Sequence, residues 1–226
     1  MPSCAQFAGV WRRSLFVGYA QNGLKSGATM VTPQFLNVSG EAMPIETLIP
    51  TGDDASDSVS IQTLSASGKT VDMYTWNDWA NDEPCWVDDN LLPVTGVVFA
   101  SGQGLWVTGS SDGQGIQSAG KVGTADVVVT LREGATPTGI PFPVAINLND
   151  ILPAGDDISD TVSIQTLSAS GKTVSMYTWN DWANDEPCWV DDNLLPVTDV
   201  VFQPGEGLWV TGSSLQQTLT FPAPEL

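Results

Sequence analysis

Short β-prone runs of apolar and polar residues alternate with turn residues along most of the chain. Val59–Leu64 and Thr70–Trp76 are two such runs, joined by the five-residue stretch Ser65–Lys69. A connection of this length that contains Gly68 predicts a hairpin in which the glycine takes a positive φ. Further β-prone runs follow at Val97–Phe99, Gly104–Thr108 and Asp126–Leu131. No stretch keeps a 3.6-residue period, so we predict an all-β fold class with little helix, sandwich-like or barrel-like.

An internal duplication dominates the sequence. Val59–Thr95 recurs as Val162–Thr198 with one change in 37 positions, Asp72 becoming Ser175. The offset of 162 − 59 = 103 residues persists outside this segment, because Gly104-Leu-Trp-Val-Thr-Gly-Ser-Ser is repeated at Gly207. The chain is therefore interpreted as a tandem repeat.

The repeat predicts two homologous β units, at residues 17–121 and 122–226, preceded by a leader at 1–16. A unit of about 100 residues is large enough to enclose its own core, unlike the shorter units of solenoids. The glycine-rich junction between the units is short, so we expect them to lie close together, in a tandem or pseudo-two-fold arrangement. Trp106 and Trp209, in β-prone segments after glycine turns, are expected to be mostly buried.

Charge and composition exclude several classes of protein. The chain has 26 acidic and 7 basic residues, a formal net charge of −19, and no histidine. Nucleic acids and anionic membranes are disfavoured as partners, because phosphate recognition requires clustered Lys and Arg. Catalytic systems that need an imidazole base are excluded. No apolar run is long enough for a transmembrane helix, so we expect no membrane insertion.

Three cysteines make an odd count, which argues against a dense disulfide framework. Cys85 and Cys188 occupy equivalent repeat positions and are interpreted as small buried side chains, although a bridge between them stays open. The N-terminus does not have the basic and apolar regions of a signal peptide.

A short glycine motif carries a resemblance to a known group of proteins. Gln203-Pro-Gly-Glu-Gly-Leu-Trp-Val and its partner Ser101-Gly-Gln-Gly-Leu-Trp-Val close the two repeats. This Pro-Gly-Glu/Gln-Gly-aromatic-Val ending resembles bacterial secreted or surface-exposed tandem β-repeat proteins. The resemblance implies a secreted or cell-surface location and supplies no active-site residues.

The segment Trp76–Asn90, repeated at Trp179–Asn193, is the first candidate site. Three tryptophans and five carboxylates fall within its 15 residues. Exposed indole faces could stack on sugar rings while Asn and Asp bond the hydroxyls, and two carboxylates could serve as acid and base. The alternatives are core tryptophans and solvated acidic loops. The candidate ligand-binding residues are Trp76, Asp78, Trp79, Asn81 and Trp86, with Trp179, Asp181, Trp182, Asn184 and Trp189.

The acidic turn Gly52-Asp-Asp-Ala-Ser-Asp, repeated at Gly155, is the second candidate site. Its carboxylates could converge on a hard cation such as Ca²⁺, which prefers six to eight oxygen ligands. Asp and Ser are equally common as turn formers, because their side chains bond the nearby backbone. No cofactor is expected, with calcium as the alternative. The candidate ligands are Asp53, Asp54 and Asp57, with Asp156, Asp157 and Asp160.

Duplication of a whole acidic module favours a non-catalytic structural or interaction protein in a surface or extracellular assembly. Protein partners or self-association are expected before a small-molecule substrate. The alternative is a carbohydrate-binding module with two equivalent sites rich in Trp and Asp, whose linkage raises the effective affinity for a glycan.

Overall fold

The computed structural model describes residues 17–79, 81–168, 170–182, 184–214 and 216–225. Within these residues the chain forms twenty β-strands, two short 3₁₀ helices and no α-helix. The prediction of an all-β fold is confirmed. The leader predicted at 1–16, with Cys4, lies outside the described residues.

Ten strands belong to the N-terminal half of the chain (residues 17–121) and ten to the C-terminal half (residues 122–225). The N-terminal half contains β1 (Val17–Gly23), β2 (Gly27–Val31), β3 (Met43–Pro44), η1 (Ile45–Thr47), β4 (Ile49–Thr51), β5 (Ser60–Leu64), β6 (Thr70–Asn77), β7 (Cys85–Val87), β8 (Val98–Phe99), β9 (Leu105–Gly109) and β10 (Gly115–Lys121). The C-terminal half contains β11 (Val127–Thr130), β12 (Gly134–Gly139), β13 (Ile146–Asn147), η2 (Leu148–Asp150), β14 (Leu152–Ala154), β15 (Ser163–Leu167), β16 (Thr173–Asn180), β17 (Cys188–Val190), β18 (Val201–Phe202), β19 (Gly207–Gly212) and β20 (Thr218–Phe221).

Six antiparallel sheets form from these strands, and each sheet of one half has a counterpart of the same order in the other. The five-stranded sheets run β2-β9-β5-β6-β7 and β12-β19-β15-β16-β17. The three-stranded sheets run β1-β10-β4 and β11-β20-β14, and the two-stranded sheets pair β3 with β8 and β13 with β18. The glycine-rich stretch expected to join two units is not a free linker. Part of it forms β10, which is the central strand of a three-stranded sheet.

The predicted hairpin is present in both halves. β5 pairs with β6, and Gly68 in the connecting turn has a φ of 75°, as has Gly171 in the turn between β15 and β16. Glycine has no Cβ, so this conformation carries no steric cost at these positions.

Alternation along the strands determines which side chains enter the core. Ile61 on β5 and Val107 on β9 are fully buried, whereas Gln62 and Trp106, one position away on the same strands, are half-buried. Successive side chains of a strand point to opposite faces, so Gln62 and Trp106 lie on the outer face of the sheet. They are direct cross-strand partners there.

The apolar core consists of two clusters, one from each half. Six members of the first cluster have an identical counterpart 103 positions later in the second. These pairs are Val59 and Val162, Ile61 and Ile164, Trp86 and Trp189, Phe99 and Phe202, Leu105 and Leu208, and Val107 and Val210.

The glycine motifs that close the two repeats hold the halves together along a line of contacts that we call the seam. Thr32 N donates to Gly205 O over 3.0 Å, and Gly104 N donates to Pro137 O over 3.1 Å. Gly104 has no room for a side chain, because an added Cβ would lie 2.6 Å from the backbone nitrogen of Thr138. Each motif therefore lies against a strand of the opposite half.

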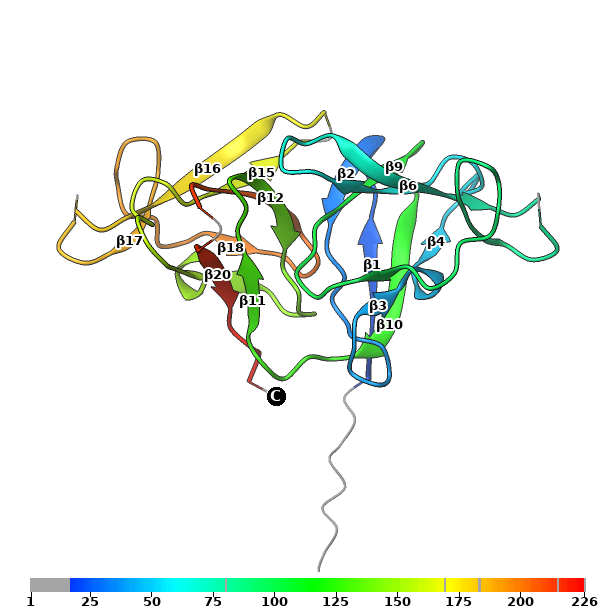
Figure 1. Cartoon of the computed structure of the whole chain (residues 1–226), viewed down its shortest axis with the longest axis horizontal. Coiled ribbons are helices and arrows are strands. Elements are labelled where there is room, and N and C mark those ends of the chain that lie inside the picture. Colours follow the sequence, from blue (N-terminus) through cyan, green and yellow to red (C-terminus); the bar gives the residue numbers. More distant parts are fainter. Residues whose placement is uncertain (1–16, 80, 169, 183, 215, 226) are drawn as a thin grey trace, which may run out of the picture.

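Figure 1 shows the two halves along the longest axis of the molecule. The loops that follow β6 and β16 lie at opposite ends of this axis, and the turns of the β5–β6 and β15–β16 hairpins lie near its middle (Figure 1). We call the described residues of the first pair the end loops (78–79 with 81–84, and 181–182 with 184–187).

Candidate functional site

Two of the candidate tryptophans are core residues. Trp86 is 1% exposed and Trp189 is 0% exposed. Their indole Nε1 groups donate to the backbone oxygens of Leu48, at 2.8 Å, and Ile151, at 2.9 Å. The expectation that Trp86 and Trp189 bind a ligand is therefore wrong, because β7 and β17 turn both rings into the core and the hydrogen bond satisfies the buried N–H.

Trp76 and Trp179 support these core rings. Each is half-buried and is paired with the core tryptophan of its half across the β6–β7 or β16–β17 ladder. The ring centroids are 5.4 Å apart in both pairs, at interplanar angles of 72° and 76°. This edge-to-face geometry is a stable arrangement of aromatic rings, so Trp76 and Trp179 act mainly in packing.

Trp79 and Trp182 are the exposed members of the set, each with 62% of its surface accessible. The Nε1 of Trp79 donates to Asp57 Oδ2 over 2.5 Å, and the other oxygen of that carboxylate accepts from Asn77 Nδ2 at 2.9 Å. The second copy repeats both bonds with Asp160. A hydrogen bond to a carboxylate is stronger than one between neutral groups. Each end loop therefore presents an indole ring that is fixed at its nitrogen.

The polar candidates in the end loops differ in their surroundings. Asp78 and Asp181 are exposed, and their backbone N–H groups donate to Ser56 Oγ and Ser159 Oγ, both over 3.1 Å. The Nδ2 atoms of Asn81 and Asn184 are buried and have no hydrogen-bond partner within the part of the chain that the structure describes. The Asp side chains are thus at the surface, and the two amide nitrogens are not.

The acidic turn does not gather its carboxylates. The described residues contain no group of three or more Asp, Glu, Cys or His side chains that could hold a metal ion. Gln114 Nε2 instead donates to the backbone oxygens of Asp53 and Asp54, both over 3.1 Å, and the carboxylates of both residues are exposed. The carboxylate of Asp57 accepts the hydrogen bond from Trp79 Nε1.

The second copy of the acidic turn has the same organisation. Gln217 Nε2 donates to Asp156 O over 2.9 Å and to Asp157 O over 3.1 Å, and Asp160 bonds Trp182. The calcium site that was the alternative interpretation of these six aspartates is therefore not formed by the described residues, because buried glutamines bind the carbonyl groups of both turns while the aspartate side chains do not converge.

Asp88 and Asp191 close a turn between β7 or β17 and the residues that follow. Hydrogen bonds from the backbone N–H groups of Leu92 and Asn90 lower the pKa of Asp88 below its ordinary value of 3.8. The pKa of Asp191 is lowered in the same way by Leu195 and Asn193. A lowered pKa keeps both carboxylates ionised at neutral pH, the opposite of what a general acid requires.

Cys85 and Cys188 are free and half-buried rather than fully buried as expected. They lie at the starts of β7 and β17, one in each half, and form no disulfide in the described structure.

Trp106 and Trp209 are not core residues, contrary to the expectation from sequence. Both are half-buried on the outer faces of the five-stranded sheets, because Leu105 and Val107, and likewise Leu208 and Val210, take the inward positions. The two rings line a hollow of about 410 Å³ between the halves, which we call the central cleft. The sequence signal that could have predicted this position is the apolar residue on each side of the tryptophan, because neighbours on a strand that face the core turn the residue between them to the outer face.

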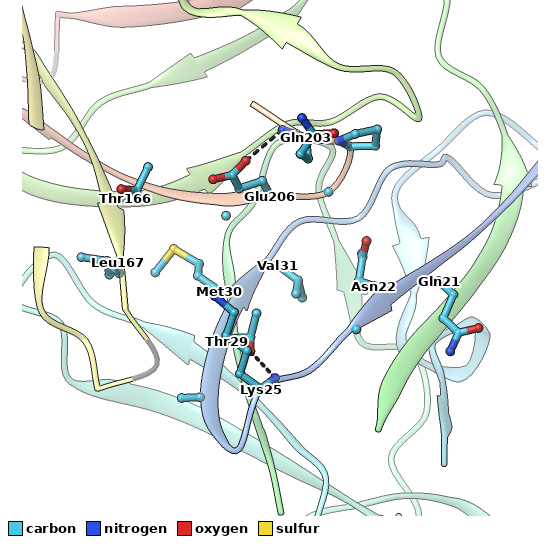
Figure 2. Close-up of a pocket in the computed structure, with 15 residues that line it drawn as sticks. Gln21, Asn22, Lys25, Thr29, Met30, Val31, Thr166, Leu167, Gln203 and Glu206 are labelled. Atoms are coloured by element: carbon cyan, nitrogen blue, oxygen red, sulfur yellow. Dashed lines mark hydrogen bonds between the residues drawn. The ribbon is translucent and has the colours of Figure 1, made fainter. Parts of the chain in front are cut away.

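Figure 2 shows a second hollow, of about 420 Å³, along the seam. Met30 and Val31 of β2 face the turn that contains Gln203 and Glu206 (Figure 2). Glu206 Oε2 accepts from Gln203 N at 2.8 Å, so its carboxylate stabilises its own turn. This hollow is part of the contact between the halves.

Comparison of the chain with models of known protein families, with curated protein sequences and with solved structures finds no match. Among the described residues, no helix has the length and apolar character needed to cross a membrane.

Proposed function

We propose that this chain is a non-catalytic binding protein, built from two tandem copies of an acidic β module, that bridges protein partners in a secreted or cell-surface assembly. The modules are residues 17–121 and 122–226, related by an approximate two-fold axis. The matched strand orders and the paired core residues of the two halves support this division.

The exposure of Trp79 and Trp182 is the observation that carries the proposal. Tryptophan is enriched among the residues that dominate binding energy at interfaces, and Trp79 and Trp182 are each 62% exposed. The bond of each Nε1 to Asp57 or Asp160 fixes the ring before binding, which reduces the entropy lost on association.

The position and charge of the end loops specify the kind of partner. The loops lie at opposite ends of the molecule, so one chain can engage two partner molecules at once (Figure 1). Exposed residues with carboxylate side chains, including Asp78, Asp82 and Glu83, belong to the same loop as the first ring. The partner surface should therefore be basic, and end-to-end association of two copies is disfavoured by like charge.

Selection from a random peptide display library tests this function. Peptides enriched on the wild-type chain should contain basic residues and bind at two per chain in calorimetry. Trp79→Ala or Trp182→Ala should leave one site, and the double variant none. Asp72→Ser, which makes the first copy match the second, is the matched control and should retain both sites. Peptides that bind the double variant unchanged would contradict the proposal.

A glycan on the same two indole faces is the second candidate, favoured by the exposure of the rings. It predicts two equivalent glycan sites per chain that are lost in the same double variant, with no selection of basic peptides.

A further inference from the structure

The central cleft has a composition unlike the rest of the surface. Its walls are built from five residues of the N-terminal half and the five residues of the same type 103 positions later in the C-terminal half. The first five are Gln62, Leu64, Gly68, Thr70 and Trp106. Each half therefore presents the same groups to the cleft from opposite sides.

Each tryptophan of the cleft contacts the hairpin turn of the opposite half. An added Cβ at Gly68 would lie 3.0 Å from Cη2 of Trp209, and one at Gly171 would lie 3.4 Å from Cη2 of Trp106. Each ring thus packs with its outer edge against the hairpin turn of the other half. Because Gly68 and Gly171 have no Cβ, the backbone at these two positions can lie directly against the ring edges, and both indoles line the cleft.

The polar groups of the cleft are arranged in the same way on both walls. Thr70 Oγ1 donates to Gln62 Oε1 over 2.8 Å, and Thr173 Oγ1 donates to Gln165 Oε1 over 2.8 Å. These bonds engage the amide oxygens, so the Nε2 donors remain for a ligand; no bond to either is formed within the described structure. Gln62 is the direct cross-strand neighbour of Trp106, which places an amide beside an indole on each wall.

None of the ten residues that line the cleft is ionisable, although the chain has a net charge of −19. The lining itself therefore offers no counter-charge to an ionic ligand, although the exposed Lys69 and Lys172 are sequence neighbours of lining residues. Two aromatic faces flanked by amide and hydroxyl groups fit a ligand with apolar faces and a rim of hydroxyl groups, which is the surface of a neutral sugar. A volume of about 410 Å³ is within the range of small-molecule sites.

We propose that the central cleft binds one neutral oligosaccharide per chain, with sugar rings stacked on Trp106 and Trp209 and hydroxyl groups bonded to Gln62 and Gln165. The site differs from the end loops in residues, charge and stoichiometry, so the proposal stands independently of the bridging function.

Calorimetry on the full chain tests the proposal with a panel of neutral hexasaccharides: β-1,4-linked glucose, xylose, mannose and N-acetylglucosamine oligomers. At least one should bind at a 1:1 ratio. Trp106→Ala and Trp209→Ala should each weaken that affinity by at least about tenfold, which corresponds to the loss of one stacking contact. The matched control Trp79→Ala/Trp182→Ala should bind as the wild type does, and an oligogalacturonate, which is anionic, should not bind.

A second variant distinguishes the loss of ligand contacts from a loss of folding. Gln62→Leu/Gln165→Leu leaves both rings in place and should weaken binding by about tenfold, with an unchanged thermal unfolding midpoint. No binding of any panel member at millimolar concentration would overturn the proposal. So would two-site binding that is lost only in the end-loop variant, a result that would instead favour glycans at the end loops.

Discussion

The end loops and the central cleft are both Trp-containing surfaces, but the duplication affects them differently. Each end loop is built within one copy of the repeat, so it occurs twice, with the same contacts around Trp79 and Trp182. The central cleft needs the hairpin of one half and the tryptophan of the other, so the two contributions form a single site. A surface built within one half of the chain thus occurs twice, whereas the surface built between the two halves occurs once.

Truncation of the core tryptophans should have the largest effect on stability and tests the equality of the two copies. We expect Trp86→Ala and Trp189→Ala each to lower the free energy of unfolding by about 3–5 kcal/mol, because each removes a fully buried ring and leaves a cavity. Chemical denaturation measures this. Trp79→Ala, at an exposed position, should cost less than about 1 kcal/mol. Markedly different losses in the two core variants would show that the copies are not equivalent.

Substitution at the seam should weaken ligand binding at the central cleft and leave ligand binding at the end loops unchanged. Gly104→Ala should cost about 1–3 kcal/mol, because the new Cβ meets the backbone of the opposite half. Gly23→Ala, where an added Cβ meets nothing within 4 Å, is the matched control and should leave stability unchanged or slightly raised. Oligosaccharide binding should weaken in Gly104→Ala while peptide binding at the end loops is retained. An equal loss at both surfaces would contradict the comparison.

A smaller effect is expected from pH, and it should be the same in both halves of the chain. The folded-state pKa values of Asp88 and Asp191 are lowered, so their contribution to stability is fully present above about pH 3.8 and is lost as the pH falls through the lower folded value. Asp88→Asn should reduce this acid-side loss by about half, whereas Asp89→Asn should not. Thermal unfolding between pH 2 and 5 measures it, and a loss of stability above pH 5 would assign the transition to other groups.

Calcium should have the smallest effect, because the carboxylates of the acidic turns point outward and do not converge. The unfolding midpoint should be the same in millimolar calcium as in a monovalent salt of matched ionic strength. A rise of several degrees specific to calcium would show a cation site, since saturation at 100 times the dissociation constant adds about 2.7 kcal/mol.

Local sequence was enough to predict some of the strands, among them β5, β6, β8, β9 and β11, and the β5–β6 hairpin, because the turn at Ser65–Lys69 and its glycine specify a local pairing. It was not enough to assign the tryptophans. Trp79 and Trp86 lie seven residues apart in one segment, yet one is exposed and the other is in the core, since only β7 returns to the sheet. For Trp106 the local sequence does carry a signal, because its neighbours Leu105 and Val107 face the core and Trp106 therefore lies on the outer face of the sheet.

The central cleft could not be predicted from either copy alone. Its second wall belongs to residues about 100 positions away, and no local pattern specifies how one half lies against the other. The acidic turn illustrates the same difficulty: Gln114, which organises Asp53 and Asp54, is 60 or more residues away.

The pairing of β1 with β10 has a consequence for how the chain folds. Val17 is the partner of Lys121, and in the C-terminal half Val127 is the partner of Phe221, so each three-stranded sheet joins residues about 100 positions apart. Such non-local pairing slows folding, because the closing of a long loop precedes the contacts that reward it. The hairpins close through five-residue turns and form much sooner. Fast local closure favours the pairing of β5 with its own β6 over the nearly identical but distant β16, so we expect it to oppose exchange between the two copies.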